Sequence, residues 1–160
     1  ESILTYGNTI RSAFYKSLPL FVQDIDLIND PDYDRLHADF YSRLGMTFSH
    51  GDYSKIDTIP GKTTISETLF RKALAFCPDH RSYLGLGMLY QQQASFDKSI
   101  QILDQGLLHF GNSMDLNICQ GVNYLNLNDF SRALTYFLDY QDQEQVRPYI
   151  IKCRDAINRL

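Results

Sequence analysis

The sequence predicts an all-α fold in which antiparallel helix pairs stack on one another. The first observation is an internal repeat within His80–Gln145, which matches itself when shifted by 34 residues. The second is apolar spacing at i, i+3, i+4 and i+7, which marks one face of an α-helix. The superposed residues are Gly87 on Gly121, Tyr90 on Tyr124, Phe96 on Phe130, Ser99 on Ala133, Ile100 on Leu134 and Leu103 on Phe137.

Residues 2–29 are predicted to form two helices. Their apolar positions have helical spacing, but Pro19 interrupts the run. Proline lacks an N–H and fixes its own φ, so it opens a second helix more easily than it continues a first. The segment 29–32 then ends the second helix and starts the next one.

The next predicted helix spans 33–49, and its pattern of Tyr41, Leu44, Gly45 and Phe48 returns at residues 83–90. Turn residues dominate 51–63, which add nine residues to the loop of this first pair. Its mate is expected at 65–76. The spacing of Thr64 and Glu67 predicts a capping box at the start of that mate helix.

The remaining helices follow the repeat and are expected at 80–92, 96–109, 114–126, 129–140 and 144–158. Asp79 is predicted to cap the first of them, and Pro148 to open the last. The last helix places Ile150, Ile151 and Cys153 on one side, which is typical of a solvating cap on a repeat stack. We therefore predict a single domain, 1–160, with N-terminal helices (1–38), three repeats (39–79, 80–113, 114–145) and a capping helix (146–160).

Composition narrows the function classes. With 44% hydrophobic and 21% charged residues, the chain suits one core, and no run approaches the roughly 20 apolar residues that a bilayer requires. The net charge is −4 and the basic residues are scattered, which disfavours nucleic-acid binding. Cys77, Cys119 and Cys153 form no close pair, so we expect inert thiols in a reducing compartment. A cytoplasmic location is expected, with the periplasm left open.

Motifs that resemble catalytic or metal sites are incomplete. Gly61-Lys62-Thr63 lacks a phosphate-binding loop's first glycine, since Ile56 stands there. A calcium-loop pattern of aspartates over 24–34 lacks its glycine at Arg35 and its final acid at Tyr41. The four histidines have no metal-ligand spacing. We therefore expect no enzyme activity, cofactor or metal in this segment. The histidines are His37, His50, His80 and His109.

The repeat resembles the tetratricopeptide repeat over about 39–145. The residues that carry the resemblance are Tyr83, Leu86, Gly87, Tyr90, Phe96, Ser99, Leu103, Gly106 and Gly111, then Gly121, Tyr124, Phe130, Ala133 and Phe137. Gly87 and Gly121 are expected where Ser99 and Ala133 of the mate helix approach closely. The chain departs from the pattern at Asn117, Gln120 and Tyr140, where an aromatic residue, leucine and alanine are usual. The resemblance implies a short right-handed superhelix.

The resemblance also implies a concave groove lined by the first helix of each pair. The groove residues it indicates are Asp39, Ser42, Met46, Ser49, His50, Arg81, Leu84, Met88, Gln91, Gln92, Asp115, Ile118, Val122, Leu125 and Asn126. Their apolar and amide character suits an extended peptide. Some of them could instead pack against neighbouring helices. Because the Lys and Asn pairs that clamp a C-terminal carboxylate are absent, a chaperone-tail receptor is disfavoured.

Two function classes remain open. One is a non-catalytic scaffold that binds a protein or peptide in the groove. The other is an accessory domain that packs against the catalytic part of a larger enzyme or regulator. The run Tyr83–Tyr90 also resembles C-terminal repeat segments of some bacterial radical-SAM proteins, which implies the second class.

Overall fold

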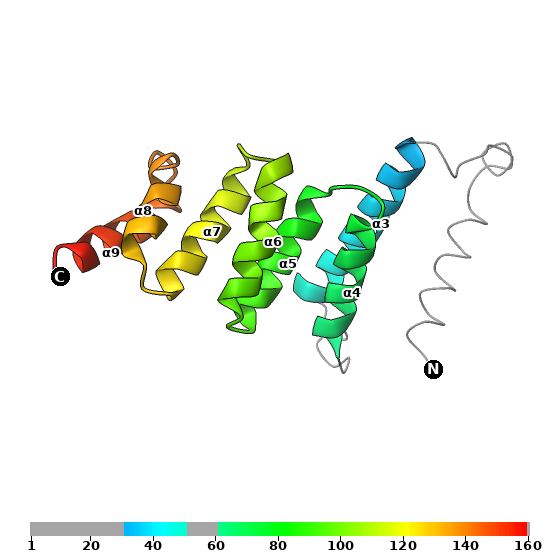
Figure 1. The fold of residues 1–160 in the computed structure, drawn as a ribbon, viewed down its shortest axis with the longest axis horizontal. Coiled ribbons are helices and arrows are strands. Elements are labelled where there is room, and N and C mark those ends of the chain that lie inside the picture. Colours follow the sequence, from blue (N-terminus) through cyan, green and yellow to red (C-terminus); the bar gives the residue numbers. More distant parts are fainter. Residues whose placement is uncertain (1–30, 51–60, 160) are drawn as a thin grey trace, which may run out of the picture. The chain divides into compact units, whose positions relative to one another are not determined.

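A computed structural model describes residues 31–50 and 61–159, so the helices predicted within 2–29 and most of the first-pair loop lie outside the described residues. The described residues from Arg35 onward belong to one compact unit. All regular structure in the described ranges is helical (Figure 1). The helices are α3 (Pro31–His50), α4 (Lys62–Leu74), α5 (His80–Gln92), α6 (Phe96–His109), α7 (Met114–Asn126), α8 (Phe130–Leu138) and α9 (Arg147–Ile157). These bounds confirm the all-α prediction.

Short polar side chains start three of the helices. Asp79 Oδ1 accepts a hydrogen bond from the backbone N–H of Ser82 at 2.8 Å, which confirms the predicted cap of α5. Ser113 Oγ and Asp129 Oδ1 accept corresponding bonds at the starts of α7 and α8. Pro148 lies in the first turn of α9, as expected from its fixed φ.

The predicted capping box at α4 is wrong. The helix begins at Lys62, directly after Gly61, whose φ of 75° lies in the left-handed region that glycine adopts without strain. Thr64 is therefore already inside the first turn, where its carbonyl accepts a hydrogen bond from Thr68 Oγ1 at 2.8 Å. The sequence contains both a glycine turn at Gly61 and a capping-box spacing at Thr64. The structure uses the glycine turn, so α4 begins three residues earlier than the capping box predicts.

The turns inside the second and third pairs repeat one backbone conformation. Ala94 and Asn128 both have positive φ, 54° and 60°, at positions 34 residues apart. The next residue in each turn donates its N–H back to a tyrosine carbonyl, Ser95 to Tyr90 at 2.8 Å and Asp129 to Tyr124 at 2.9 Å. The repeat therefore extends from the side-chain pattern to the left-handed turn that closes each first helix.

Glycine sets the close approach of the two helices in each pair. A Cβ on Gly87 would lie 2.7 Å from the side chain of Leu103, which confirms the predicted close contact. The covering residue is Leu103 rather than Ser99, although Ser99 Oγ donates to the Gly87 carbonyl at 2.8 Å. The equivalent contacts are Gly45 with Phe70 at 2.7 Å and Gly121 with Phe137 at 2.6 Å.

Two departures from the tetratricopeptide pattern compensate for each other. Asn117 replaces an aromatic residue and Tyr140 replaces alanine, and Asn117 Nδ2 donates to Tyr140 Oη at 3.0 Å. The same amide nitrogen also donates to the Ser113 carbonyl at 2.8 Å. The two changes thus exchange an apolar contact for a hydrogen-bonded link between α7 and the turn that follows α8.

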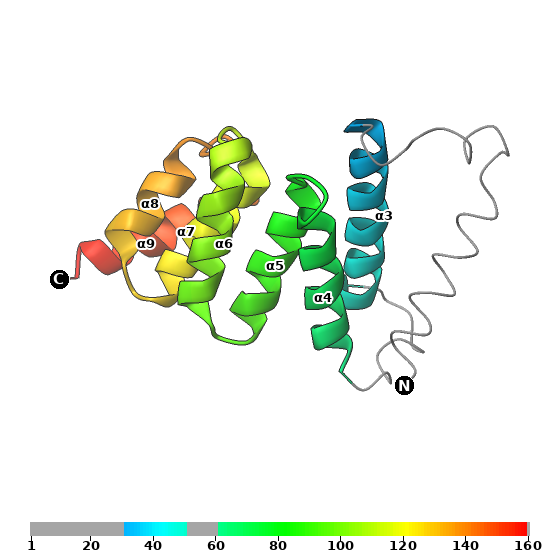
Figure 2. The same ribbon diagram turned by 45° about the vertical axis from the view of Figure 1, so that its right-hand side comes forward.

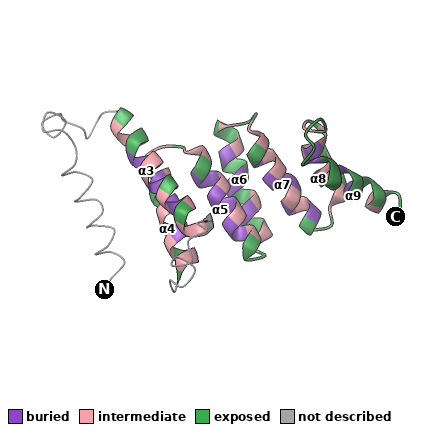
Figure 3. Ribbon diagram, turned by 180° about the vertical axis from the view of Figure 1, so that it is seen from behind, coloured by how far each residue is buried: buried purple, intermediate pink, exposed green. Residues whose placement is uncertain are grey.

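The helices bury three clusters of apolar side chains. Figures 1 and 2 show α5 beside α6 and α8 beside α9, and both pairs pack closely. Figure 3 shows buried and exposed residues on the same helices, as expected for helices that pack on one face. The clusters centre on Phe70, Leu86 and Leu103; on Phe137, Val146 and Cys153; and on Ala38, Tyr41 and Ala73.

The prediction for the face of α9 needs one correction. Ile150 and Cys153 are buried, but Ile151 is 59% exposed. Consecutive residues on a helix point about 100° apart, so Ile151 turns away from the face that Ile150 buries. The outer side of α9 therefore carries apolar surface and is not the purely polar cap expected from sequence.

A candidate binding groove between α5 and α7

An open groove of about 390 Å³ lies along α5 and α7 and reaches the start of α9. Its residues are spaced three, four or seven apart on α5 and α7, so each helix contributes one face. The α5–α7 groove is lined by Leu84, Met88 and Gln91 of α5, Asp115, Ile118, Cys119 and Val122 of α7, and Gln145 and Tyr149 beside and within α9.

The structure brings part of the predicted groove set together. Leu84, Met88, Gln91, Asp115, Ile118 and Val122 line the α5–α7 groove. Gln92 and Asn126 are exposed beyond it, and Met46 packs against the core cluster around Phe70. Leu125 is only 7% exposed and belongs to the core cluster around Phe137. His50 is the last residue of α3, and its side chain is outside the described part.

Asp39 and Arg81 from the predicted set form an ion pair instead. Arg81 Nη1 lies 2.5 Å from Asp39 Oδ1, which joins α5 to α3. Asp39 also pairs with Arg43 at 2.7 Å, and the Arg43 hydrogen bond is the main cause that holds the pKa of Asp39 below its usual value. Ser42 is fully buried and donates to the Asp39 carbonyl, and Ser49 donates to the Met46 carbonyl. Of these contacts, the Asp39–Arg81 pair joins two helices and the others lie within α3. None of these residues lines the α5–α7 groove.

Sequence reasoning missed three residues of the groove wall. Cys119 lies one turn after Asp115, so helical counting from that residue could have found it, and it also belongs to the buried core cluster around Phe70. Burial raises the pKa of the Cys119 thiol to about 12, the charge of Asp115 acts in the same direction, and a hydrogen bond from Gln91 lowers it. A thiol that stays protonated is a poor nucleophile and a poor metal ligand. Gln145 and Tyr149 reach the groove only through the packing of α9 on α8.

A chain of hydrogen-bonded polar side chains, here called the polar network, lies behind the groove. Its members are Gln91, Ser99, Asp104, Gln120 and Asn123. Ser99, Gln120 and Asn123 are fully buried. Asn123 Nδ2 donates to Ser99 Oγ at 2.8 Å and to Gln120 Oε1 at 3.2 Å, while Gln120 Nε2 donates to Asp104 Oδ1 at 2.6 Å. The polar network therefore joins α5, α6 and α7.

This bonding pattern determines the orientation of the Gln91 amide. Gln91 Nε2 lies 2.7 Å from the Cys119 carbonyl, which can only accept, and 2.8 Å from Asn123 Oδ1. Asn123 uses both of its N–H groups on Ser99 and Gln120, so its oxygen must also be an acceptor. Both N–H groups of Gln91 are thus engaged. Its Oε1 accepts no hydrogen bond from the described residues, on a side chain that lines the groove.

Asp104 of α6 forms the outer end of the polar network. Asp104 is exposed on α6, yet it accepts the hydrogen bond of the fully buried Gln120. Burial raises the pKa of the Asp104 carboxyl, against a smaller lowering by the Gln120 hydrogen bond. Gln101, which is exposed on the same helix, is the better control position.

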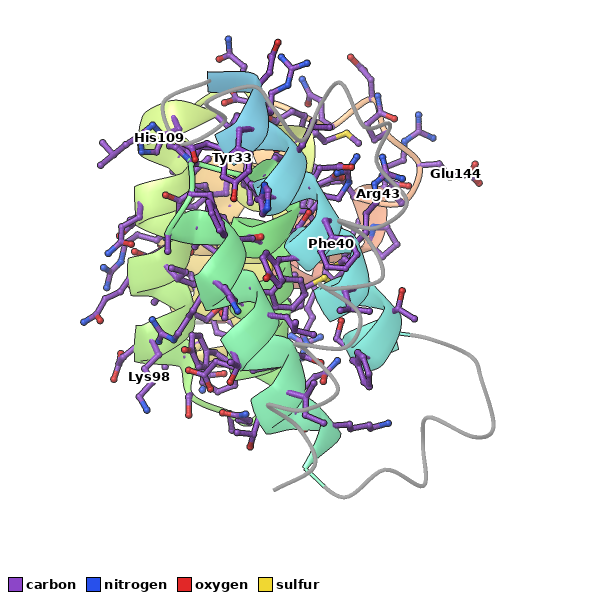
Figure 4. The ribbon with its side chains drawn as sticks, turned by 90° about the vertical axis from the view of Figure 1, so that its right-hand side faces the viewer. Tyr33, Phe40, Arg43, Lys98, His109 and Glu144 are labelled. Carbon is purple, nitrogen blue, oxygen red and sulfur yellow. The ribbon has the colours of Figure 1, made fainter. Side chains whose placement is uncertain are left out.

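The groove wall carries a negative charge at Asp115. Asp115 is the one charged residue in the groove wall, and it forms no ion pair with the described residues. Glu144 precedes the wall residue Gln145 and is exposed. Figure 4 shows Glu144 on the same side as Arg43 of α3, opposite Lys98 and His109 of α6. The described residues contain no group of three or more His, Cys, Asp or Glu side chains that could hold a metal ion.

Among solved structures, the chain resembles MamA from AMB-1, which has a tetratricopeptide-like helical-repeat fold. The two share 17% identity with a TM-score of 0.59, and the match covers 78% of this chain and 66% of that chain. At this identity the likeness establishes the fold alone, which is a tetratricopeptide-like helical repeat. The match spans slightly less than two thirds of MamA. No family model and no curated protein sequence matches the chain. None of the described helices is long and apolar enough to cross a membrane.

Proposed function

We propose that this chain is a non-catalytic binding domain that recruits a partner protein by holding a peptide segment in the α5–α7 groove. The observation that carries the proposal is the wall of half-buried apolar side chains, Leu84, Met88, Ile118 and Val122, on the first helices of adjacent repeats. Helical-repeat folds use such surfaces to bind extended segments of other chains.

The groove has the chemistry that a peptide requires. Leu84, Ile118 and Val122 offer apolar area, and Met88 adapts its shape because its side chain is unbranched and polarizable. Gln91, Gln145 and the Tyr149 ring supply polar atoms along the same wall. A ligand that buries apolar side chains here also needs partners for its backbone N–H and C=O groups, and amide side chains provide both kinds.

The proposal is tested with a phage-displayed library of random decapeptides as the probe. Met88→Glu or Ile118→Glu places a charge in the apolar wall and should weaken the selected peptides by about 1–3 kcal/mol, roughly 5- to 150-fold in Kd, through lost burial and uncompensated desolvation. Gln101→Glu on α6 is the control and should bind like the parent. Leu125→Glu is unsuitable because Leu125 is buried in the core.

Circular dichroism and thermal melting accompany the binding measurements. If both groove variants remain folded and bind the selected peptides as tightly as the parent, the α5–α7 groove is not the binding surface. If no peptide is enriched over an unrelated helical protein, the proposed function itself is wrong.

A second candidate function is that of an accessory domain that packs against another part of a larger enzyme or regulator. It is favoured by the outer side of α9, where Ile151 is 59% exposed beside a hollow of about 590 Å³. Pro148, Ala156 and Phe130 of α8 line the same hollow. The full reading frame distinguishes the two candidates, because an adjoining catalytic domain would favour the accessory role.

A further inference from the structure

We propose that the α5–α7 groove selects a basic peptide segment, in which a backbone N–H donates to Gln91 Oε1 and a nearby Lys or Arg pairs with Asp115. This inference rests on the proposed function and adds the chemical class of the peptide. It follows from two independent features of the groove wall, the fixed orientation of one amide and the isolated charge of one carboxylate.

The first feature is that Gln91 presents only an acceptor. A glutamine on a surface can rotate its amide to offer either a donor or an acceptor. Here both N–H groups are held by the Cys119 carbonyl and by Asn123 Oδ1, and Asn123 is itself fixed by Ser99 and Gln120. Turning the Gln91 amide over would bring its oxygen against two acceptors. The ligand must therefore supply a hydrogen-bond donor, and a backbone N–H is the donor that every extended peptide repeats.

The second feature is the charge of Asp115. An acidic residue in the first turn stabilises a helix by itself, so its presence in α7 has a local explanation. Asp115 differs from Asp97, the first-turn acid of α6, because Asp115 lines a groove. Its charge is also one cause of the raised pKa of Cys119, which lies in the same wall. An exposed carboxylate in the wall of an open groove favours a cationic side chain over a neutral or acidic one through charge complementarity.

The spacing of the two features predicts the order of residues in the peptide. Gln91 contacts α7 at Cys119 and Asn123, four and eight residues after Asp115. At 1.5 Å per residue, Asp115 lies about 6–12 Å further along the helix axis. An extended chain advances about 3.3 Å per residue, so the basic residue should lie about two to four residues from the one that donates to Gln91. Apolar side chains between them would face Met88, Ile118 and Val122.

The test uses peptides selected by the folded chain from the phage-displayed decapeptide library, then resynthesised. Lys or Arg should be enriched at one position. Asp115→Asn should weaken these peptides about tenfold and remove the preference for a basic residue, and the loss should shrink at high salt. Asp97→Asn changes an acid at the same helical position outside the groove, so it should bind like the parent.

N-methylation of single backbone positions tests the Gln91 contact. One methylated position, two to four residues from the basic one, should lose about tenfold in affinity for the parent. The same methylation should have no further effect on Gln91→Leu. If the peptides show no basic preference, or if Asp115→Asn binds like the parent while Met88→Glu loses binding, this inference is overturned and the proposed function stands. If no peptide is enriched at all, both are wrong.

Discussion

Helix α7 packs on two neighbourhoods that differ in chemistry. Toward α5 and α6 it presents Gln120 and Asn123, both fully buried and hydrogen-bonded within the polar network. Toward α8 it presents Gly121, against which the fully buried ring of Phe137 packs. Behind that ring the cluster continues with Val146 and Cys153, and Phe137 stacks on Tyr149 with ring centroids 5.2 Å apart. One junction is polar and the other is apolar.

The two junctions of α7 differ more in how specifically they position the helix than in how much they stabilise the fold. An apolar contact has no preferred direction, so Phe137 could pack nearly as well after a small shift of its neighbours. Each amide of the polar network has donors and acceptors that match one arrangement, and a shifted register would leave buried groups unpaired at a cost of about 1–3 kcal/mol each. We infer that the polar junction fixes the position of α7 against α5, and therefore the geometry of the α5–α7 groove.

The largest expected effect lies in the apolar junction. Phe137→Ala removes a fully buried ring that covers Gly121 and stacks on Tyr149, so the free energy of unfolding should fall by about 3–5 kcal/mol. Thr135→Ala, two residues away and exposed, is the control. Chemical denaturation of both variants measures the difference. A loss below about 1 kcal/mol would show that the cluster around Phe137 collapses into the space.

An intermediate effect is expected in the polar junction. Asn123→Ala leaves Gln91, Ser99 and Gln120 short of a partner and should cost about 1–3 kcal/mol of unfolding free energy. Asn126→Ala, one turn later on the same helix and exposed, is the matched control. Chemical denaturation again measures the loss.

The same variant tests the role of the network in binding. If the network positions the groove, Asn123→Ala should also weaken the selected peptides, because it frees the Gln91 amide to rotate. Equal stability and equal binding for the two asparagine variants would contradict the specificity argument.

The sequence predicted the features that depend on local order. Helical periodicity and the 34-residue repeat located the helices of the second and third pairs, and Gly87 and Gly121 marked the close contacts. It did not predict which departures from the repeat belong together. Gln120 pairs with Asp104, 16 residues away, and Asn117 pairs with Tyr140, 23 residues away, and no local pattern records these separations.

The groove residues also divide into those that local spacing predicts and those that depend on tertiary packing. Leu84, Met88 and Gln91 followed from helical spacing, whereas Gln145 and Tyr149 enter the wall through the packing of α9. Leu125 has the spacing of a groove residue, yet it turns into the core around Phe137. Spacing indicates which side of a helix a residue occupies, but the neighbouring helices decide how much of that side they cover.

The smallest effect on unfolding free energy is expected from a change at Asp104, the outer end of the polar network, which accepts a hydrogen bond from Gln120. Because burial raises the pKa of Asp104, the folded chain binds a proton there more readily than the unfolded chain does. The charged carboxylate therefore costs some stability at neutral pH. That cost disappears as the pH falls through the raised pKa of Asp104 in the folded chain and below its pKa near 3.8 in the unfolded chain.

The variant Asp104→Asn tests this balance, because it keeps an acceptor oxygen for Gln120 and removes the charge. We expect it to match or exceed the parent in unfolding free energy at pH 7 by less than about 1 kcal/mol, with a smaller difference at pH 4, as measured by urea denaturation. A parent that is clearly more stable than Asp104→Asn at pH 7 would show that the hydrogen bond to the charged carboxylate outweighs its desolvation, and the polar junction would then contribute stability as well as register.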